Sequence, residues 1–389
     1  MFFGMIYLRK LTEVVIMIKL FRAIIGLFLS IYYFPASLVA GNETVDNNIR
    51  YQLERMNYLK TEFYENYTPC DESKIANFNI DEAIENGVKF NEVQFLATHN
   101  SYQIDATEEY KKLYYAVGDL TFGIVNTEKV EFNMDSLTEQ FELGIRSVEI
   151  DIETVDKKGD ISFVISHNPL YDNTSSCFDF ELALEEIKLW SDNNPNHLPI
   201  TVIIEPKKDV PPIRNMKNFK AKYANEIDKI LRDKMGDALL TPADMMGDYE
   251  SLKEMRENDG WLPLSETMGK VIFLLHDSVA TPGYINQDET MKSQAMFPML
   301  RSIDKDRSYA SFIIDNEPVI AIENEEELLD RCNLIVRTRA DSFPNFSESR
   351  YEIADRCSSQ IISTDYPIRK GDSKYHVYSF NGYTVKLQK

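Results

Sequence analysis

The chain has 389 residues, of which 43% are hydrophobic and 27% are charged, with 15 Gly and 15 Pro. This composition is that of a globular protein and excludes a disordered chain. The formal net charge of −21 argues against nucleic acid as a partner, because phosphate backbones are bound by clustered Lys and Arg. It also argues against non-specific adhesion to anionic membranes, so any lipid chemistry must be local to a pocket.

The N-terminal residues differ in composition from the rest of the chain. Basic residues precede the apolar run 23–34, and small residues follow it up to Gly41. This order predicts a secretory signal peptide at residues 1–41 and therefore a secreted, extracellular protein. The alternative is an uncleaved signal anchor, although the run is short for a span of about 20 residues. Whether translation starts at Met1 or Met17 stays open.

Two further features fit the secretory route. Four cysteines lie beyond the signal peptide: Cys70, Cys177, Cys332 and Cys357. An even count in a secreted protein favours disulfides, with Cys332–Cys357 as the preferred pair because it brackets one short segment, and Cys70–Cys177 by elimination. The alternative is four buried thiols, and no Cys or His spacing suggests zinc. Glycosylation is expected from four N-x-S/T sequons, at Asn42, Asn66, Asn173 and Asn345.

The rest of the chain divides into an extension and one domain. Residues 42–88 are polar and charged, with a helix predicted around Asn48–Tyr64. From residue 89 to 389, short apolar runs alternate with helical patterns such as Leu137–Gly144 and Phe180–Asn193, which is typical of βαβ units. The predicted strands are Val93–Thr98, Ile145–Ile150, Ile161–Ser166, Ile200–Glu205, Val271–His276, Val319–Ile322, Leu334–Thr338 and Gln360–Thr364. Eight such strands match one (β/α)8 TIM barrel, an α/β fold.

Polar residues gather where the first four predicted strands end. They are His99 and Asn100, Glu149 and Asp151, His167, and Glu205 and Lys207. In a (β/α)8 barrel the carboxyl ends of the strands form one rim, and catalytic groups gather there. We therefore expect these side chains at one mouth of the barrel.

The carboxylates in this set predict a cation site. Glu149 and Asp151 are two residues apart in an extended strand, so both side chains point to the same face. Two such charges on an apolar strand are costly unless something pairs them. Oxygen ligands from Asn100, Glu149, Asp151 and Glu205 suit calcium or magnesium rather than zinc. The two histidines then remain available as base and acid for displacement at phosphorus.

Each of these elements also has a simpler structural interpretation. A lone histidine at a strand end is more often an ordinary hydrogen-bonded residue, and an E-x-D pair is more often a solvated edge. Glu205-Pro206-Lys207 alone is a surface turn. The joint order of H-N, E-x-D, H-N and E-x-K, each closing an apolar run, favours the functional interpretation, since chance should rarely produce it.

In this order the motifs resemble the superfamily of phosphatidylinositol-specific phospholipases C. The resemblance is closest to the calcium-dependent members, including the X-type catalytic barrel of eukaryotic enzymes. It covers roughly residues 90–370 and rests on segments 97–102, 144–151 and 165–169, with weaker support from 337–341 and 363–367. Pleckstrin-homology, EF-hand and C2 modules are not recognisable, so the chain resembles the small secreted type.

The resemblance implies a catalytic mechanism. His99 would hydrogen-bond the phosphoryl oxygen, and Glu149 would deprotonate the inositol 2-hydroxyl. His167 would protonate the departing diacylglycerol oxygen. The first product would be a cyclic inositol phosphodiester.

The resemblance also implies ligands and partners. Calcium would be held by Asn100, Glu149, Asp151 and Glu205. Lys207 would contact the phosphate of phosphatidylinositol or a related phosphodiester, and Arg339 is a candidate rim residue for substrate binding. The protein would be a monomer with transient membrane-surface contact, for which Asp105–Met134 is a candidate loop.

Two other functions stay open at this point. A glycerophosphodiester phosphodiesterase shares the barrel, the histidine pair and the E-x-D, but typically carries H-R-G where this chain has His99-Asn100-Ser101. The acidic net charge keeps such a soluble substrate in consideration. A catalytically inert barrel used as a binding protein would require a decayed site, whereas all six core positions are intact. The head group, and whether phosphorylated inositides are accepted, are not fixed by the sequence.

Overall fold

The computed structural model describes residues 45–108, 111–112, 115, 132–167, 174–208, 215–367 and 378–388. The predicted signal peptide, two sequons (Asn42 and Asn173) and most of the candidate loop Asp105–Met134 lie outside these residues. Within them, no helix combines the length and the apolar character needed to cross a bilayer.

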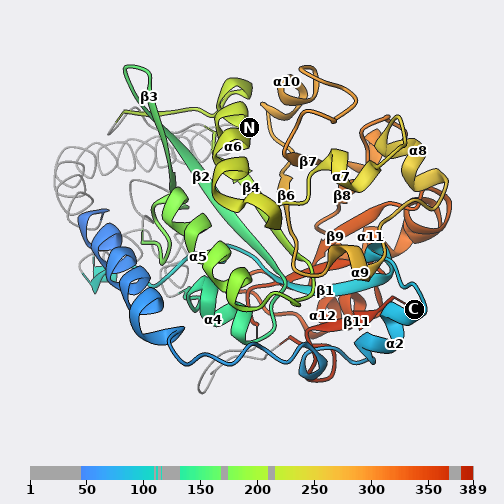
Figure 1. The fold of residues 1–389 in the computed structure, drawn as a ribbon, viewed down its shortest axis with the longest axis horizontal. Helices are drawn as coiled ribbons and strands as arrows, with labels where there is room; N and C mark the ends of the chain where they lie inside the picture. Colours follow the sequence, from blue (N-terminus) through green and yellow to red (C-terminus); the bar gives the residue numbers. More distant parts are fainter. Residues whose placement is uncertain are drawn as a thin grey trace, which may run out of the picture.

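Parallel strands close into a barrel at the centre of the molecule, which confirms the predicted (β/α)8 fold (Figure 1). The eight barrel strands are β1 (Val93–Thr98), β2 (Ser147–Lys157), β4 (Ile200–Pro206), β6 (Val271–Leu275), β7 (Met296–Leu300), β8 (Phe312–Ile314), β9 (Ile335–Arg339) and β10 (Ile361–Thr364). Each strand pairs in parallel with the next. The barrel closes through β1, which pairs with β10 at Phe95–Ile361 and with β2 at Ala97–Ser147.

Three further strands extend this sheet. β3 (Asp160–Ile165) and β5 (Met216–Lys217) run antiparallel to β2, and β11 (Val385–Leu387) runs antiparallel to β1. The β2–β3 hairpin projects from the barrel as a long two-stranded ribbon (Figure 1). Its turn places Lys158 and Gly159 at φ values of 60° and 101°, a region that glycine enters without steric cost.

Two of the eight predicted barrel strands do not belong to the barrel, although the first of them is a strand. Ile161–Ser166 corresponds to the hairpin strand β3 instead of a barrel strand. Val319–Ile322 lies in a helix, α11 (Pro318–Glu323), where Val319 is 47% exposed. Proline at the first helical position favours a helix start, so this apolar run is a half-exposed helix.

The two barrel strands that the sequence pattern did not reveal are β7 and β8. β7 contains Pro298, and a proline inside an apolar run argues against a strand. β8 is only three residues long, below the length at which alternation can be recognised.

Helices surround the barrel (Figure 1). They are α2 (Ile80–Glu85), α4 (Leu137–Glu142), α5 (Phe180–Asn193), α6 (Ala221–Met235), α7 (Pro242–Met246), α8 (Leu252–Glu257), α9 (Leu264–Thr267), α10 (Thr281–Ile285), α11 and α12 (Glu348–Arg356). Both predicted barrel helices are confirmed: α5 has the predicted bounds, and α4 begins at the predicted residue. α5 begins where it does because the Asp179 side chain accepts a hydrogen bond from Leu182 N at 3.0 Å.

The N-terminal extension packs against α5 and α4. Residues 45–58 are helical and continue into a π-helical turn, Leu59–Phe63, which confirms the helix predicted there. Gln52 donates to Asp179 O (3.0 Å) and accepts from Asp179 N (2.7 Å). Arg55 forms an ion pair of 2.6 Å with Glu186, whose other oxygen accepts from Thr138 N. These buried polar contacts fix the extension to the barrel.

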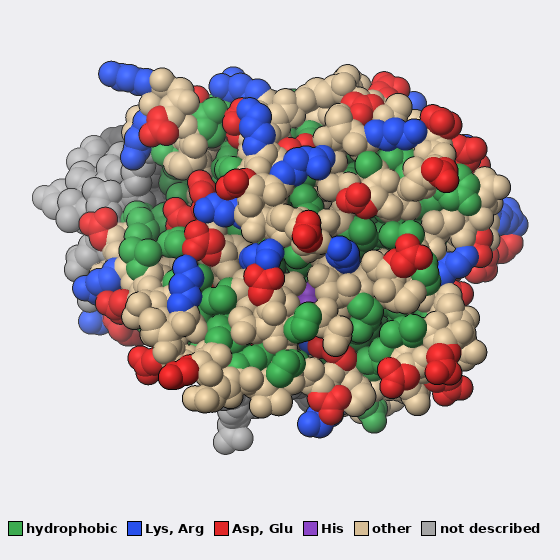
Figure 2. Space-filling view, viewed as in Figure 1, with side chains coloured by type: hydrophobic (Ala, Val, Ile, Leu, Met, Phe, Trp, Pro, Cys, Tyr) green, Lys and Arg blue, Asp and Glu red, His purple; other side chains and the backbone are tan. Residues whose placement is uncertain are grey.

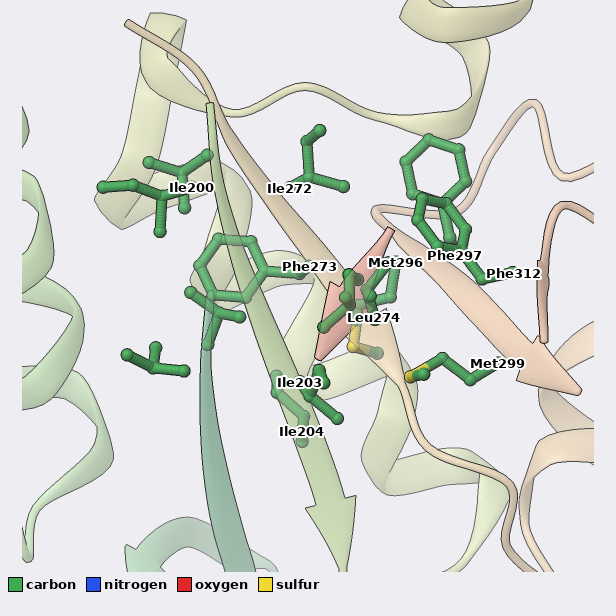
Figure 3. Packing of buried hydrophobic residues seen from close by; sticks show 14 of the residues in the cluster. Ile200, Ile203, Ile204, Ile272, Phe273, Leu274, Met296, Phe297, Met299 and Phe312 are labelled. Carbon is green, nitrogen blue, oxygen red and sulfur yellow. The ribbon is translucent and has the colours of Figure 1, made fainter. Parts of the chain in front are cut away.

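Apolar side chains pack on both faces of the barrel strands. The parallel register pairs Ile203 of β4 with Leu274 of β6, and Phe273 of β6 with Met296 of β7. Because successive residues of a strand point to opposite faces, the two pairs lie on opposite faces of the sheet (Figure 3), and all four residues are buried. Phe297 and Phe312 pack edge to face with ring centroids 5.2 Å apart. The burial of these apolar side chains is the main source of stability. Because they occupy the interior, polar side chains gather at the rim formed by the carboxyl ends of the strands.

The four cysteines are free thiols in the structure. Cys357 Sγ lies 2.9 Å from Ser359 Oγ, and Cys70 Sγ lies 3.4 Å from Tyr67 OH. Neither of the predicted disulfides, Cys332–Cys357 and Cys70–Cys177, is present. A disulfide requires the two Cβ atoms about 4 Å apart in a specific orientation, which closeness in sequence does not ensure.

Candidate active site

The carboxyl ends of the barrel strands surround a pocket of about 330 Å³. It is lined by His99, Asn100, Glu149, His167, Glu205, Lys207, His276, Asn316, Arg337 and Arg339. An adjoining hollow of about 140 Å³ adds Gln103, Phe132, Ser342, Phe343 and Asp365. Seven of the eight predicted site residues line this pocket, and the eighth, Asp151, is buried beside it. In Figure 2, histidine atoms are visible between the side chains near the centre of the face shown.

The predicted carboxylates form one cluster. Glu149, Asp151 and Glu205 each bring an oxygen to within 4.8 Å of the others. Alternation along β2 places Glu149 and Asp151 on the same face, and the parallel register pairs Asp151 with Glu205 on β4. Asn100, which lines the same pocket, has a φ of 50°, a conformation that asparagine tolerates better than most residues.

This donor set fits calcium. Asp151 Oδ1 is buried and has no hydrogen-bond partner among the residues that the structure describes. A buried carboxylate oxygen without a donor is costly, and a hard cation would satisfy it. Oxygen ligands from carboxylates and an amide are those that calcium prefers.

Basic residues also contact the cluster. Arg337 on β9 reaches across the barrel to Glu149 Oε2 at 2.6 Å. Lys207 Nζ lies 2.6 Å from Asp151 Oδ2 and 3.2 Å from Glu205, and Tyr102 OH donates to Asp151 Oδ2 at 2.7 Å. These three ion pairs partly balance the carboxylate charges.

The environments of the two β2 carboxylates differ. Burial alone would raise the pKa of Glu149, but Arg337 and His99 lower it to about 2. Burial raises the pKa of Asp151 to about 6, although Lys207 opposes the shift. Burial also acts to lower the pKa of Lys207, which its carboxylate neighbours nevertheless raise above its usual range. Glu149 and Lys207 are therefore charged at neutral pH.

His99 is oriented by Asp365, which follows β10. His99 Nδ1 lies 2.8 Å from Asp365 Oδ1, and Nε2 lies 3.6 Å from Glu149. Arg339 also approaches Nδ1, at 3.2 Å. Nδ1 cannot donate to Asp365 and accept from Arg339 at once. The contact with the Asp365 carboxylate is the shorter one, so we infer that Nδ1 carries a proton and donates it in a hydrogen bond to Asp365. Nε2 then faces the pocket.

Asp365 is itself held firmly. Its Oδ2 accepts from Phe343 N at 2.6 Å, and its backbone N donates to Asp341 Oδ1 at 2.6 Å. Burial raises the pKa of Asp365, but His99 and Arg339 outweigh it and leave the pKa below the usual value. An ionised Asp365 fixes the tautomer of His99.

His167 reaches the pocket from the β2–β3 hairpin. It lies two residues after β3, is exposed, and lines both hollows. Beside it, the buried residue Ser166 donates to Glu153 Oε1 at 3.0 Å. Burial raises the pKa of Glu153 to about 7.

Several residues that line the pocket or contact its carboxylates were not predicted. His276 directly follows β6, so the strand-end rule could have found it. Arg337 lies two residues before Arg339 on β9 and therefore points to the same face. Asn316 follows β8, and Tyr102 lies in a loop after β1; the first could not be placed without β8, and the second carries no distinctive signal.

Two solved structures are similar in fold to this chain. The myoinositol complex of a calcium-dependent phosphoinositol-specific phospholipase C from Pseudomonas sp. shares 16% identity with a TM-score of 0.52, over 82% of this chain and 99% of that one. Its apo form in a second crystal form shares 17% identity with a TM-score of 0.51, over 77% and 95%. At these identities the likeness concerns the fold. A search of curated proteins gave no match.

The family assignment comes from the sequence itself. Residues 160–389 match the family described as phosphoinositide phospholipase C, Ca2+-dependent. His167, Glu205, Lys207 and Arg339 lie inside the matched segment, and the motifs of β1 and β2 precede it. The match favours this family over the glycerophosphodiester alternative and covers more than half of the chain. The chain therefore belongs to the Ca2+-dependent phosphoinositide phospholipase C family of phosphodiesterases.

Proposed function

We propose that the protein is a secreted enzyme that cleaves phosphatidylinositol between glycerol and phosphate. Attack by the inositol 2-hydroxyl would release diacylglycerol and leave a cyclic inositol phosphate. The observation that supports this most is the meeting of His99 and His167 with the carboxylate cluster in one pocket. Acid, base and charge-stabilising groups are what in-line displacement at phosphorus requires.

The proton of the 2-hydroxyl needs a base in this pocket. The motif resemblance assigns that task to Glu149, but the ion pair of 2.6 Å with Arg337 weakens this carboxylate as a base, since a nearby positive charge stabilises its ionised form. His99 Nε2 lies 3.6 Å from Glu149 and carries the free lone pair, because Nδ1–H donates to Asp365. We therefore assign the proton transfer to His99, with Glu149 as its electrostatic partner and as a metal ligand.

The departing glycerol oxygen needs an acid. His167 lies on the rim of both hollows, and a protonated imidazole there would give its proton to the diacylglycerol oxygen. Lys207 and Arg339, which line the same pocket, would contact the phosphate. Asn100, Glu149, Asp151 and Glu205 would hold calcium. When bound, calcium supplies positive charge for the phosphoryl oxygens and acidifies the attacking hydroxyl.

A product assay tests this function. Phosphatidylinositol is offered with calcium and with excess chelator, and the products are separated. We expect cyclic inositol phosphate and diacylglycerol in calcium and none in chelator. Free alcohol with a phosphomonoester would instead point to a different phosphodiesterase.

The secretory route is a separate part of the proposal and rests on the apolar run 23–34 with its small-residue exit. N-terminal sequencing of protein collected from the medium should begin at Asn42 or a neighbouring residue. Recovery of an intact N-terminus in the membrane fraction would establish a signal anchor and contradict secretion as a free enzyme.

A further inference from the structure

The two proposed proton-transfer residues are held in different ways. His99 directly follows β1, a barrel strand, and its backbone N donates to Thr364 O at 3.2 Å. His167 follows β3, which pairs with β2 in a hairpin whose first pair is Ile152–Ile165 and which also bridges to the segment before α5 at Val164–Asp179. From Glu153 onward, β2 has left its pairing with β4. His167 is therefore attached to the barrel through the end of β3 and does not directly continue a barrel strand.

Ser166 attaches the end of β3 to β2. Its backbone N donates to Asp151 O at 3.2 Å, and its hydroxyl donates to Glu153 Oε1 at 3.0 Å. Both Ser166 and Glu153 are buried, with exposed fractions of 0% and 1%. The residue immediately before His167 is thus held by its main chain and by its side chain.

Glu153 itself calls for an explanation. It is the third carboxylate on one face of β2, after Glu149 and Asp151, and it lies outside the carboxylate cluster. Its Oε2 is buried and has no hydrogen-bond partner among the described residues. A buried acceptor without a donor lowers stability, so a residue needed only for packing would not require this carboxylate.

We propose that Glu153 is a positioning residue for His167 and acts through the Ser166 hydroxyl. The inference rests on the proposed function, in which His167 protonates the leaving oxygen. Loss of the Glu153–Ser166 hydrogen bond would let the end of the hairpin shift, and the acid would no longer be aligned with that oxygen. The carboxylate cluster and His99, which are held by the barrel, would keep their geometry.

The test compares two substrates that differ in their need for an acid. Phosphatidylinositol has an alkoxide leaving group that must be protonated, whereas a p-nitrophenyl ester of inositol phosphate has one that leaves without a proton. For Ser166→Ala and Glu153→Leu we expect kcat on phosphatidylinositol to fall by about 10- to 100-fold. KM should stay within about two-fold, and the nitrophenyl substrate should lose less than about three-fold.

Further variants separate this role from a purely structural one. Glu153→Gln keeps an oxygen acceptor for Ser166 and should stay close to the parent on both substrates. The double variant should lose no more than either single variant, because both remove the same hydrogen bond. Ser162→Ala, on the exposed side of β3, is the matched control and should leave activity unchanged. Ser166→Ala removes only a hydroxyl, so it still decides the question if Glu153→Leu fails to fold.

His167→Ala separates the failure of this inference from the failure of the proposed function. If His167→Ala loses activity selectively on phosphatidylinositol and Ser166→Ala does not, the positioning role is overturned and the acid role stands. If His167→Ala loses activity equally on both substrates, the acid role is overturned together with the inference. Equal losses on both substrates for Ser166→Ala, or additive losses in the double variant, would also overturn the positioning role.

Discussion

His99 and His167 are the proposed base and the proposed acid of one pocket, and their surroundings differ. His99 has its Nδ1 proton committed to Asp365, which leaves Nε2 as an acceptor. His167 is exposed at the rim, where a leaving group can reach solvent. The assignment of base and acid follows from these surroundings.

Replacement of either histidine should therefore remove most of the activity. We expect His99→Ala and His167→Ala each to reduce kcat on phosphatidylinositol by at least about 10²-fold, the usual contribution of an acid–base group. Thermal melts should show that both variants remain folded. Near-normal turnover in either variant would exclude that residue from proton transfer.

The carboxylate cluster makes a separate prediction at Asp151. Asp151→Asn keeps the size of the side chain but removes one charge from the cation site, so calcium affinity should fall more than folding stability does. Calorimetric titration with calcium measures the first quantity and urea unfolding the second. Asp160→Asn, on the exposed face of β3, is the matched control and should change neither. Unchanged calcium affinity in Asp151→Asn would remove this residue from the ligand set.

At the scale of elements, β2 supplies two of the three carboxylates of the cluster. Three buried carboxylates, at positions 149, 151 and 153, lie on one face of this strand. Their surroundings differ along its length, because Arg337 contacts the first, Lys207 the second and Ser166 the third. One strand thus presents carboxylates with pKa values from about 2 to about 7.

Glu153 should make stability depend on pH. Its pKa is raised to about 7 in the folded protein, against about 4.3 in an unfolded chain. The folded state therefore binds the extra proton, and this stabilisation is lost as pH rises from about 4.3 to about 7. Relative to the parent, Glu153→Gln should gain stability at pH 8 and show little gain at pH 5. Urea unfolding at the two pH values checks this, and an equal gain at both would contradict the raised pKa.

The strands and site residues that could be predicted share one property. β1, β4, β6, β9 and β10 are short apolar runs, and most of the predicted site residues stand at their ends or in β2. Contacts between segments that lie far apart in the sequence leave no such local pattern. Arg337 and Glu149 are 188 positions apart in sequence, so their ion pair could be found only once the barrel was closed.

The hairpin and the cysteines show a second limit of the sequence. An apolar run such as Ile161–Ser166 looks the same in a barrel strand and in a projecting hairpin, because local patterns do not specify the partner strand. Disulfides depend on the separation of two Cβ atoms, which cysteine spacing does not determine. Both errors concern which segments meet in space.

At the scale of the whole molecule, the acidic charge sets the conditions for activity. The net charge of −21 opposes the approach to an anionic lipid surface. Salt screens such repulsion beyond about 10 Å at 0.1 M, while the pocket groups act at contact distance. The approach to the lipid surface should therefore become easier as ionic strength rises, whereas the chemical step in the pocket should change less.

Calcium should stabilise the entire fold. Because the ion would bind the folded barrel and not the unfolded chain, the melting temperature should rise with calcium concentration. Calcium should restore activity after chelation better than magnesium, which tends to keep its own waters. A thermal melt across a calcium titration, paired with activity in chelator, measures both effects. Full activity in excess chelator without any calcium effect on melting would contradict the metal assignment.

The projecting hairpin has an evolutionary consequence. The metal-site carboxylates and His99 belong to barrel strands or directly follow them, whereas His167 follows β3, the hairpin strand that is not itself a barrel strand. Insertions or deletions in the β2–β3 hairpin could therefore move the proposed acid and change which leaving groups it can protonate, while the rest of the site stays unchanged. Relatives that differ in substrate should then diverge first in the length and the sequence of this hairpin.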